Sequence, residues 1–166
     1  LILPRVEAVR AAAPDAEVVI DANEAWQGED LPQLCEQLAN LGVAMLEQPL
    51  PVAEDEPLAH FRHPLPICAD ESCHTRKDLP RLQGRYDMLN IKLDKTGGLT
   101  EALALAEAGK AAGFELMLGC MLCTSRAVRA AWPLGHLVRF VDLDGPTWLA
   151  KDINPLRFAG GRVYWT

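Results

Sequence analysis

The chain has 166 residues, of which 49% are hydrophobic and 23% are charged, as in an ordinary soluble polypeptide of one-domain length. Its net charge of −7 argues against binding nucleic acid through a basic patch, because such a patch needs clustered Lys and Arg. No apolar stretch approaches the roughly 20 residues of a membrane helix, and the first residues lack the basic start and apolar core of a signal peptide. We therefore expect a cytoplasmic domain, residues 1–166, that binds neither membranes nor nucleic acid.

The five cysteines are an odd number and lack the dense spacing of a disulfide-stapled secreted protein. Cys120 and Cys123 have the spacing of a redox or zinc pair, but a zinc site would need a second closely spaced pair. Cys68 and Cys73 make a poor second pair. We therefore expect reduced thiols that pack as small apolar side chains.

Helical and strand-like segments alternate over the first 93 residues. Pro14 breaks the first helix, and Asp30 and Gly42 are suited to the start and the end of the second. Thr75 is suited to cap the fourth helix. The predicted helices lie at about 6–13, 31–41, 53–61 and 75–83, and the predicted strands begin at 18 and cover 43–46, 66–69 and 88–93.

The alternation continues to the end of the chain. Thr96–Thr100 has the residues of a turn and a helix cap, and the alanine-rich stretch after it is strongly helical. The last helix contains Pro133, and Gly160–Gly161 predicts a short hairpin in the tail. The predicted helices lie at 101–112 and 125–138, the strands at 115–118 and 140–143, and the hairpin at 158–166.

This strict alternation predicts an α/β fold with a parallel sheet and helical crossovers. A complete (β/α) barrel of the TIM type has eight strands and about 250 residues, whereas six strands are predicted here. We therefore expect the carboxy-terminal portion of a barrel that lacks the first two strands. A doubly wound open sheet is the alternative, but its G-x-G-x-x-G turn is absent from the sequence.

Acidic residues follow three successive predicted strands: Asp21, Glu47 and Asp70. Because the active sites of parallel barrels lie at the carboxyl ends of the strands, these side chains are expected to converge on one cation. An oxygen-only ligand set suits Mg²⁺, with Mn²⁺ as a substitute. A single acidic residue at such a junction often only caps the next helix, but three in succession make capping alone a weaker account.

Two further candidate sites follow later strands. Lys92 ends the fourth strand, where partial burial and neighbouring cations would let a lysine act as a base; the alternative is a surface lysine, as Lys95 is expected to be. Asp142 and Asp144 are two residues apart, so on a strand they would share a face and could bind one cation. The alternative for this pair is a turn that precedes Gly145–Pro146.

Six stretches together resemble a known family. Four of them resemble the enolase superfamily, in particular its muconate lactonising subgroup: Asp21–Trp26, Leu46–Pro49, Ala69–Ser72 and Asn90–Gly98. Two more resemble the dipeptide epimerases of that subgroup, of the L-Ala-D/L-Glu type: Gly119–Ser125 and Asp142–Pro146. The four stretches occur in family order, and the resemblance covers essentially the whole chain.

The resemblance implies an isomerase that epimerises dipeptides by 1,1-proton transfer between two lysines, through an enediolate intermediate, with magnesium as the cofactor. The substrate would be a small dipeptide, held by its ammonium group and its carboxylate. The implied residues are the metal ligands Asp21, Glu47 and Asp70, the supporting residues Asn23 and Glu71, the catalytic Lys92, and the substrate-binding Asp142, Asp144, Cys120 and Met121.

The family also has an amino-terminal capping domain and a first lysine in a Lys-x-Lys motif, and we expect this missing segment to be a partner of the chain. A cycloisomerase or o-succinylbenzoate synthase of the same subgroup, or a non-catalytic metal-binding fragment, is the alternative. The sequence leaves open which dipeptide is preferred and whether the protein is a homo-oligomer.

Overall fold

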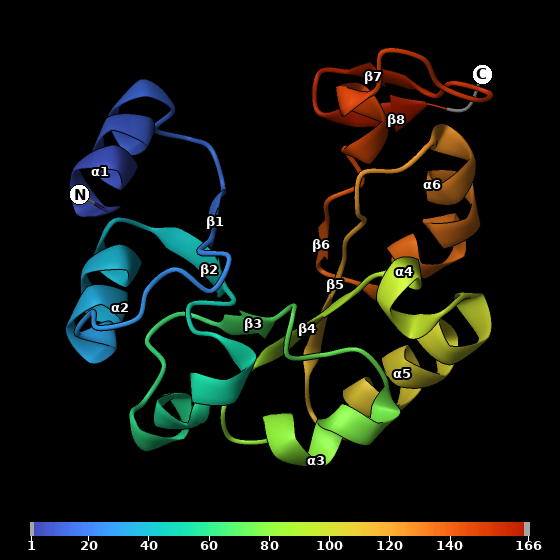
Figure 1. The fold of residues 1–166 in the computed structure, drawn as a ribbon. Helices are drawn as coiled ribbons and strands as arrows, with labels where there is room; N and C mark the ends of the chain where they lie inside the picture. Colours follow the sequence, from blue (N-terminus) through green and yellow to red (C-terminus); the bar gives the residue numbers. More distant parts are fainter. Residues whose placement is uncertain (1, 165–166) are drawn as a thin grey trace. The chain divides into compact units, whose positions relative to one another are not determined.

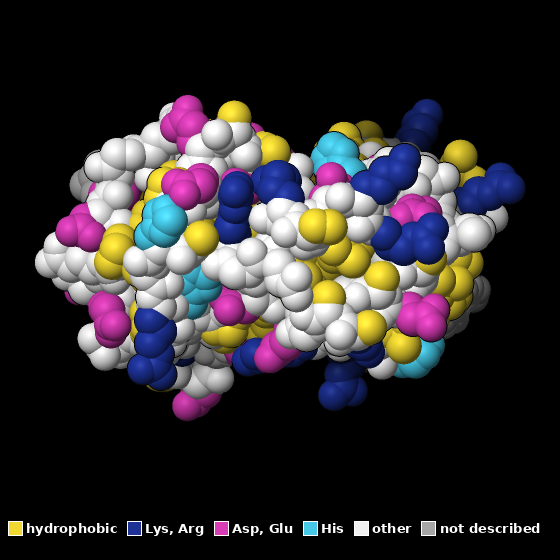
Figure 2. Space-filling model, turned by 90° about the horizontal axis from the view of Figure 1, so that it is seen from below, with side chains coloured by type: hydrophobic (Ala, Val, Ile, Leu, Met, Phe, Trp, Pro, Cys, Tyr) yellow, Lys and Arg dark blue, Asp and Glu magenta, His cyan; other side chains and the backbone are white. Residues whose placement is uncertain are grey.

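The computed structural model describes residues 2–164, which form two compact units (Figure 1). The first unit comprises the chain up to Ser72 together with Pro80–Met88. The second comprises Cys73–Leu79 and the chain from Leu89 onward. None of the helices in the described residues combines the length and the apolarity that a bilayer span requires. Figure 2 shows Lys and Arg side chains interspersed with Asp and Glu on the face that it displays.

Six strands form one sheet whose strand order is the sequence order, which confirms the predicted α/β barrel topology. The printed pairings of β1 with β2, β2 with β3, and β5 with β6 are all parallel. Most strand residues after the first strand are fully buried, as expected for a sheet covered by helices. The strands are β1 (Val18–Asp21), β2 (Val43–Glu47), β3 (Ile67–Ala69), β4 (Met88–Ile91), β5 (Glu115–Leu118) and β6 (Phe140–Val141).

In the first unit, two helices precede β1 and β2: α1 (Ile2–Ala12) and α2 (Leu31–Asn40). The predicted cap of α2 is confirmed, since the Asp30 side chain accepts a hydrogen bond from the backbone N–H of Gln33 at 3.2 Å. The helix buries a leucine-rich face against β2. Arg10 connects the ends of the two helices by donating to the carbonyls of Leu41 and Gly42.

Two of the predicted helices are shorter or differently wound than expected. The segment 53–61 consists of two 3₁₀ turns, η1 (Val52–Glu54) and η2 (Glu56–His60), because Pro57 has no N–H with which to continue an α-helical ladder. The segment 75–83 begins with the predicted Thr75 cap but divides into η3 (Arg76–Asp78) and α3 (Leu79–Leu82).

In the second unit, β4 ends two residues earlier than predicted, because Lys92 begins the short helix α4 (Leu93–Thr96). The predicted helix 125–138 becomes α6 (Ser125–Ala131) followed by η4 (Trp132–Leu137), and Pro133 stands at the change. Helix α5 (Leu99–Ala111) and the hairpin strands β7 (Arg157–Ala159) and β8 (Arg162–Tyr164) agree with the prediction within two residues, and residues 165–166 of the hairpin lie outside the described part. The 3₁₀ turn η5 (Gly145–Trp148) was not predicted as a helical element.

Candidate active site

The strand-end carboxylates of the first unit lie on neighbouring strands. Asp21 and Glu47 are the last residues of β1 and β2 and are direct partners in the parallel register. Glu47 is in turn the partner of Cys68 on β3, and Asp70 follows that strand directly. Glu47 and Asp70 are only 4% and 3% exposed, whereas Asp21 is exposed. The sheet therefore brings the backbone of all three predicted ligands to the carboxyl ends of adjacent strands.

The backbone directly after β1 and β2 is strained. Asn23, Glu24 and Gln48 all have positive φ, at 44°, 61° and 34°, a region that non-glycine residues seldom adopt. Hydrogen bonds hold this conformation: the Asn23 N–H donates to Asp21 Oδ1 at 2.8 Å, and the Glu24 N–H donates to the Gln48 carbonyl at 2.8 Å. The contact to Asp21 comes from the backbone of Asn23 and not from its side chain. Strain of this kind is typical of functional sites.

Glu71 lies among other carboxylates. Burial, and then the negative charges of Asp70, Asp21 and Glu24, raise the pKa of Glu71 above its ordinary value. Its Oε2 atom is buried and accepts no hydrogen bond from the described residues. The end of the sheet therefore concentrates negative charge that a bound cation would neutralise.

The donor chemistry of this cluster fits a hard divalent cation, because every candidate ligand offers carboxylate oxygen and Glu71 leaves one buried oxygen without a donor. The side chains are not yet gathered around one point. Within residues 2–164, no group of three His, Cys, Asp or Glu side chains is arranged to hold a metal ion. Binding would therefore require Asp21, Glu47 and Asp70 to turn toward a common centre.

Lys92 stands in the second unit, half-buried at the end of β4. Its side chain runs past Gly119, where an added Cβ would lie 2.9 Å from Lys92 Cε and 2.6 Å from Asn90 Oδ1. Glycine at 119 therefore leaves the space that both side chains occupy. Lys95, by contrast, donates from Nζ to the backbone carbonyl of Asn90 at 2.9 Å, which is a structural role.

Asp142 and Asp144 follow β6, and both are exposed on either side of the buried Leu143. The Asp142 N–H donates to the Leu118 carbonyl at 2.8 Å, which extends the pairing with β5 by one residue. The alternative of a turn at this pair is also present, because Asp144 begins η5 and accepts from Trp148 Nε1 at 3.1 Å. Asp142 therefore continues the extended strand, and Asp144 stands at the start of a turn.

Cys120 and Met121 lie beside these aspartates. An added Cβ at Gly145 would collide with the Met121 carbonyl and would lie 3.1 Å from Cys120 Sγ, so η5 packs closely on this loop. Burial, and to a smaller degree the charges of Asp142 and Asp144, raise the pKa of Cys120. The structure thus brings together four residues predicted to bind substrate. Met121 is 51% exposed, whereas Cys120 is half-buried.

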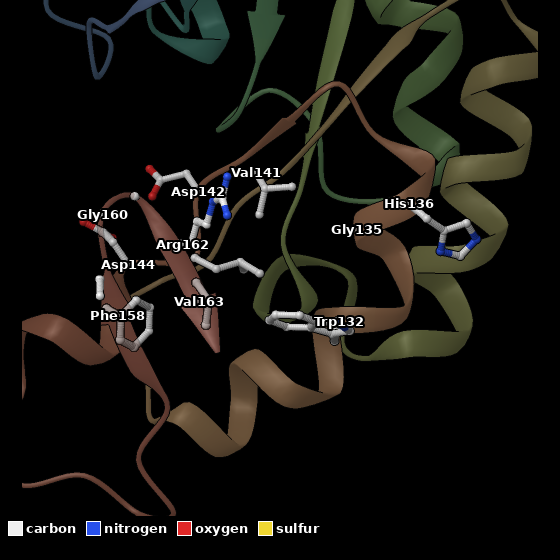
Figure 3. Close-up of a pocket in the computed structure, with 13 residues that line it drawn as sticks. Trp132, Gly135, His136, Val141, Asp142, Asp144, Phe158, Gly160, Arg162 and Val163 are labelled. Carbon is white, nitrogen blue, oxygen red and sulfur yellow. The ribbon is translucent and has the colours of Figure 1, made fainter. Parts of the chain in front are cut away.

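A cavity of about 780 Å³ opens beside Asp142 and Asp144 (Figure 3). Arg162 of β8 extends toward Asp142, and Phe158 and Trp132 supply apolar walls. Sequence reasoning missed Arg162, because the hairpin offered no signal beyond its turn glycines. Two carboxylates beside an arginine form a mixed-charge rim on a largely apolar pocket.

None of the five cysteines forms a disulfide, and burial raises the pKa of the Cys123 thiol to about 12. The expected burial of the cysteines is confirmed for Cys35, Cys68 and Cys73, while Cys120 and Cys123 are half-buried.

Residues 2–164 match the family described as "Enolase C-terminal domain-like". The chain belongs to this family. The match covers both units, and with the sequential parallel strands it confirms the resemblance that the motifs carried.

Relatives within the family are named as epimerases or racemases. The L-Ala-D/L-Glu epimerase of Escherichia coli (strain K12) is 64% identical over 99% of this chain and 51% of the relative, and a solved structure of the same name gives a TM-score of 0.96, covering 99% of this chain and 52% of that one. The N-acetyl-D-glutamate racemase of Pseudoalteromonas sp. is 52% identical over 91% of this chain and 48% of the relative. The chain thus spans about half the length of these relatives.

A solved enolase family member from Agrobacterium tumefaciens is described as homologous to dipeptide epimerases, with bound sodium and L-Ala-L-Glu. It is 47% identical, covers 98% of this chain and 50% of that structure, and gives a TM-score of 0.92. Other solved neighbours are described as dipeptide epimerases with magnesium.

Proposed function

We propose that this chain is the barrel portion of a magnesium-dependent dipeptide epimerase that acts on L-Ala-D/L-Glu by 1,1-proton transfer. The observation that carries the proposal is the register of the strand ends: Asp21 pairs with Glu47, and Asp70 follows the next strand. The names of the relatives support the substrate class. The activity belongs to the intact protein, since the relatives named for it are about twice as long.

The metal is assigned to the oxygen ligands Asp21, Glu47 and Asp70, which Asn23 and Glu71 support. The difficult step is to remove the proton next to a carboxylate, because negative charge then accumulates on a group that is already anionic. Magnesium, when bound, would offset that charge where it develops. Buried ligands such as Glu47 and Asp70 would strengthen the attraction, because little water screens it.

Lys92 is assigned the acid/base role on one face of the α-carbon. Lys92 is half-buried at the end of β4, and a lysine whose ammonium form is disfavoured could accept the α-proton of the substrate and return it. The opposite face is assigned to the first lysine of the family, in the Lys-x-Lys segment outside these residues.

Asp142 and Asp144 are assigned to the ammonium group of the dipeptide, with Cys120 and Met121 beside it. Two exposed carboxylates at the end of β6 attract a cation and hold the substrate by the end opposite its reacting carboxylate. A second candidate function is the racemisation of an N-acetyl amino acid, which the 52% identical relative favours. Such a substrate has no ammonium group, so it would not need this pair.

The test uses the intact protein in deuterium oxide, with L-Ala-L-Glu and L-Ala-D-Glu as separate substrates followed by proton NMR. We expect Lys92→Ala to stop epimerisation in both directions. One epimer should still exchange its α-proton, with retention of configuration, because the other lysine still serves that face. Lys95→Ala is the matched control and should still epimerise.

Two results would contradict the assignment of Lys92. Continued epimerisation by Lys92→Ala would remove it from the mechanism, and loss of exchange from both epimers would indicate a structural role.

A further inference from the structure

Gln48 connects the ends of β2 and β3 in the first unit. Its side chain is fully buried, and its Oε1 accepts the backbone N–H groups of Asp70 at 2.9 Å and Ser72 at 3.1 Å. Its Nε2 donates to the Leu50 carbonyl at 2.7 Å and to Ser72 Oγ at 2.9 Å. Glu47 directly precedes Gln48, and the Gln48 side chain holds the backbone N–H of Asp70. The Gln48 amide thus links the backbone beside two predicted metal ligands.

Asp55 lies at the base of this arrangement and has no exposed surface. Its Oδ2 accepts from Ser72 Oγ at 2.8 Å, Tyr86 Oη at 3.0 Å and Arg81 Nη1 at 2.8 Å, and its Oδ1 accepts from Arg85 Nη1 at 2.6 Å. Burial by itself disfavours the charged carboxylate, but these hydrogen bonds outweigh it and hold the pKa of Asp55 below its ordinary value. The group is therefore a fixed anion with a full set of donors.

We propose that Asp55 is a positioning residue for the metal site: through Ser72 and Gln48 it fixes the backbone that carries Glu47 and Asp70. The path is short. Asp55 holds the Ser72 hydroxyl, that hydroxyl contacts the Gln48 amide, and the same amide accepts the Asp70 N–H. This inference rests on the proposed function, since it concerns the ligands of the magnesium site assigned above.

The Asp55 network is not explained by its contribution to stability alone. A buried ion pair adds little net stability compared with well-packed apolar residues, because desolvation of the charges offsets their attraction. Here two arginines and two hydroxyls are directed at one carboxylate, and the network ends on a strained residue, Gln48, with φ at 34°. Strain directly after a predicted ligand requires support from the surrounding structure, and the Asp55 network provides it.

The test is the dissociation constant of Mg²⁺ for the intact protein, measured by titration calorimetry well below the unfolding temperature. Ser72→Ala removes one of the two hydroxyls that Asp55 and Gln48 share, the other being that of Tyr86, and leaves both arginine pairs in place. We expect magnesium affinity to fall about 10-fold or more, the range seen when groups that orient metal ligands are removed. Asp55→Asn should weaken binding at least as much.

Ser125→Ala is the matched control. Ser125 is also fully buried, donates to an aspartate, Asp152, at 2.5 Å, and accepts the Leu156 N–H at 2.8 Å, but it belongs to the second unit. It should lower the melting temperature and leave magnesium affinity unchanged. If Asp55→Asn does not fold, Ser72→Ala and Tyr86→Phe still decide the question.

The measurements distinguish failure of the proposed metal site from failure of the positioning role of Asp55. A wild-type protein that binds no magnesium, or that binds it equally well as Glu47→Gln, would overturn the metal site itself. If Glu47→Gln loses binding but Ser72→Ala and Asp55→Asn bind as tightly as wild type, the positioning role is wrong. It is also wrong if Ser125→Ala weakens binding as much as Ser72→Ala, because general destabilisation would then explain both.

Discussion

The two units hold their functional candidates in opposite ways. In the first unit, Glu47 and Asp70 are buried, and the Gln48 amide fixes the backbone beside both. In the second, Asp142 and Asp144 are exposed and follow a two-residue strand. A metal ion is bound more tightly when the surrounding structure supports its ligands, whereas an incoming substrate needs accessible groups. The difference in burial therefore agrees with the roles proposed above, metal binding for Glu47 and Asp70 and substrate binding for Asp142 and Asp144.

The largest expected effect tests whether the second unit, despite its exposed aspartates, holds one side chain, that of Lys92, in a fixed position. Gly119→Ala should lower kcat of the intact protein about 100-fold, because the new Cβ would displace the Lys92 side chain, and much of the acid/base contribution proposed for Lys92 would be lost. Overpacking should also cost about 1–3 kcal/mol of stability. Steady-state kinetics and thermal unfolding measure the two effects.

Gly135→Ala is the control for this substitution, since no atom lies within 4 Å of an added Cβ there. It should leave kcat near the wild-type value. Full activity in Gly119→Ala would mean that Lys92 need not lie where the structure places it.

An intermediate effect is expected at the exposed pair. Asp142→Asn and Asp144→Asn should each raise KM for L-Ala-L-Glu up to about fivefold, since an exposed ion pair contributes at most about 1 kcal/mol. KM for N-acetyl-glutamate should not change, because that substrate has no ammonium group. Equal effects on both substrates would show that the aspartates act through the loop and not through charge.

The smallest effect concerns a pair at the opposite end of β3 from Asp70. His63 is half-buried beside the exposed Asp87, with Nδ1 2.7 Å from Asp87 Oδ2 and Nε2 2.8 Å from the Leu58 carbonyl. Burial disfavours the charged ring, but these two hydrogen bonds prevail and raise the pKa of His63. Only the protonated ring donates from both nitrogens, so folding favours the charged form.

This contribution to stability is complete below the unfolded pKa of about 6.5 and is lost as the pH rises through the higher folded pKa. Urea unfolding of wild type and His63→Gln from about pH 6 to about pH 9 should show a difference that shrinks with rising pH. A constant difference would contradict the raised pKa.

The sequence predicted the elements whose cause is local. Asp30 and Thr75 begin their helices as expected, because the capping groups lie within three residues of the N–H groups that they accept. It failed at Pro57, where the predicted helix consists of two 3₁₀ turns, and at Pro133, where the second part of the predicted helix is a 3₁₀ helix. The periodicity of apolar residues alone does not show where an α-helix ends when the segment contains a proline.

The residues of the candidate site also divide into those with a local sequence signal and those without one. The carboxylates at the strand ends could be predicted because each ends an apolar run of the sequence or directly follows it. Asp55 carried no signal, since it lay within a predicted helix and its partners Ser72, Arg81 and Arg85 come from 17 to 30 residues farther along the chain. Arg162 was missed for a similar reason, because only folding places its hairpin beside Asp142.

The contact between Gly145 and the loop of Met121 has a consequence for how substrate preference could change. The backbone of this loop packs directly against Gly145, because nothing larger than a hydrogen atom fits between Gly145 and the Met121 carbonyl. This contact fixes the path of the loop. The side chains of Met121 and Leu122 nonetheless face outward, 51% and 69% exposed. Substitutions at these two positions would alter the shape and polarity of the surface without moving its scaffold. Such a surface can diversify through single mutations while the fold beneath it remains intact.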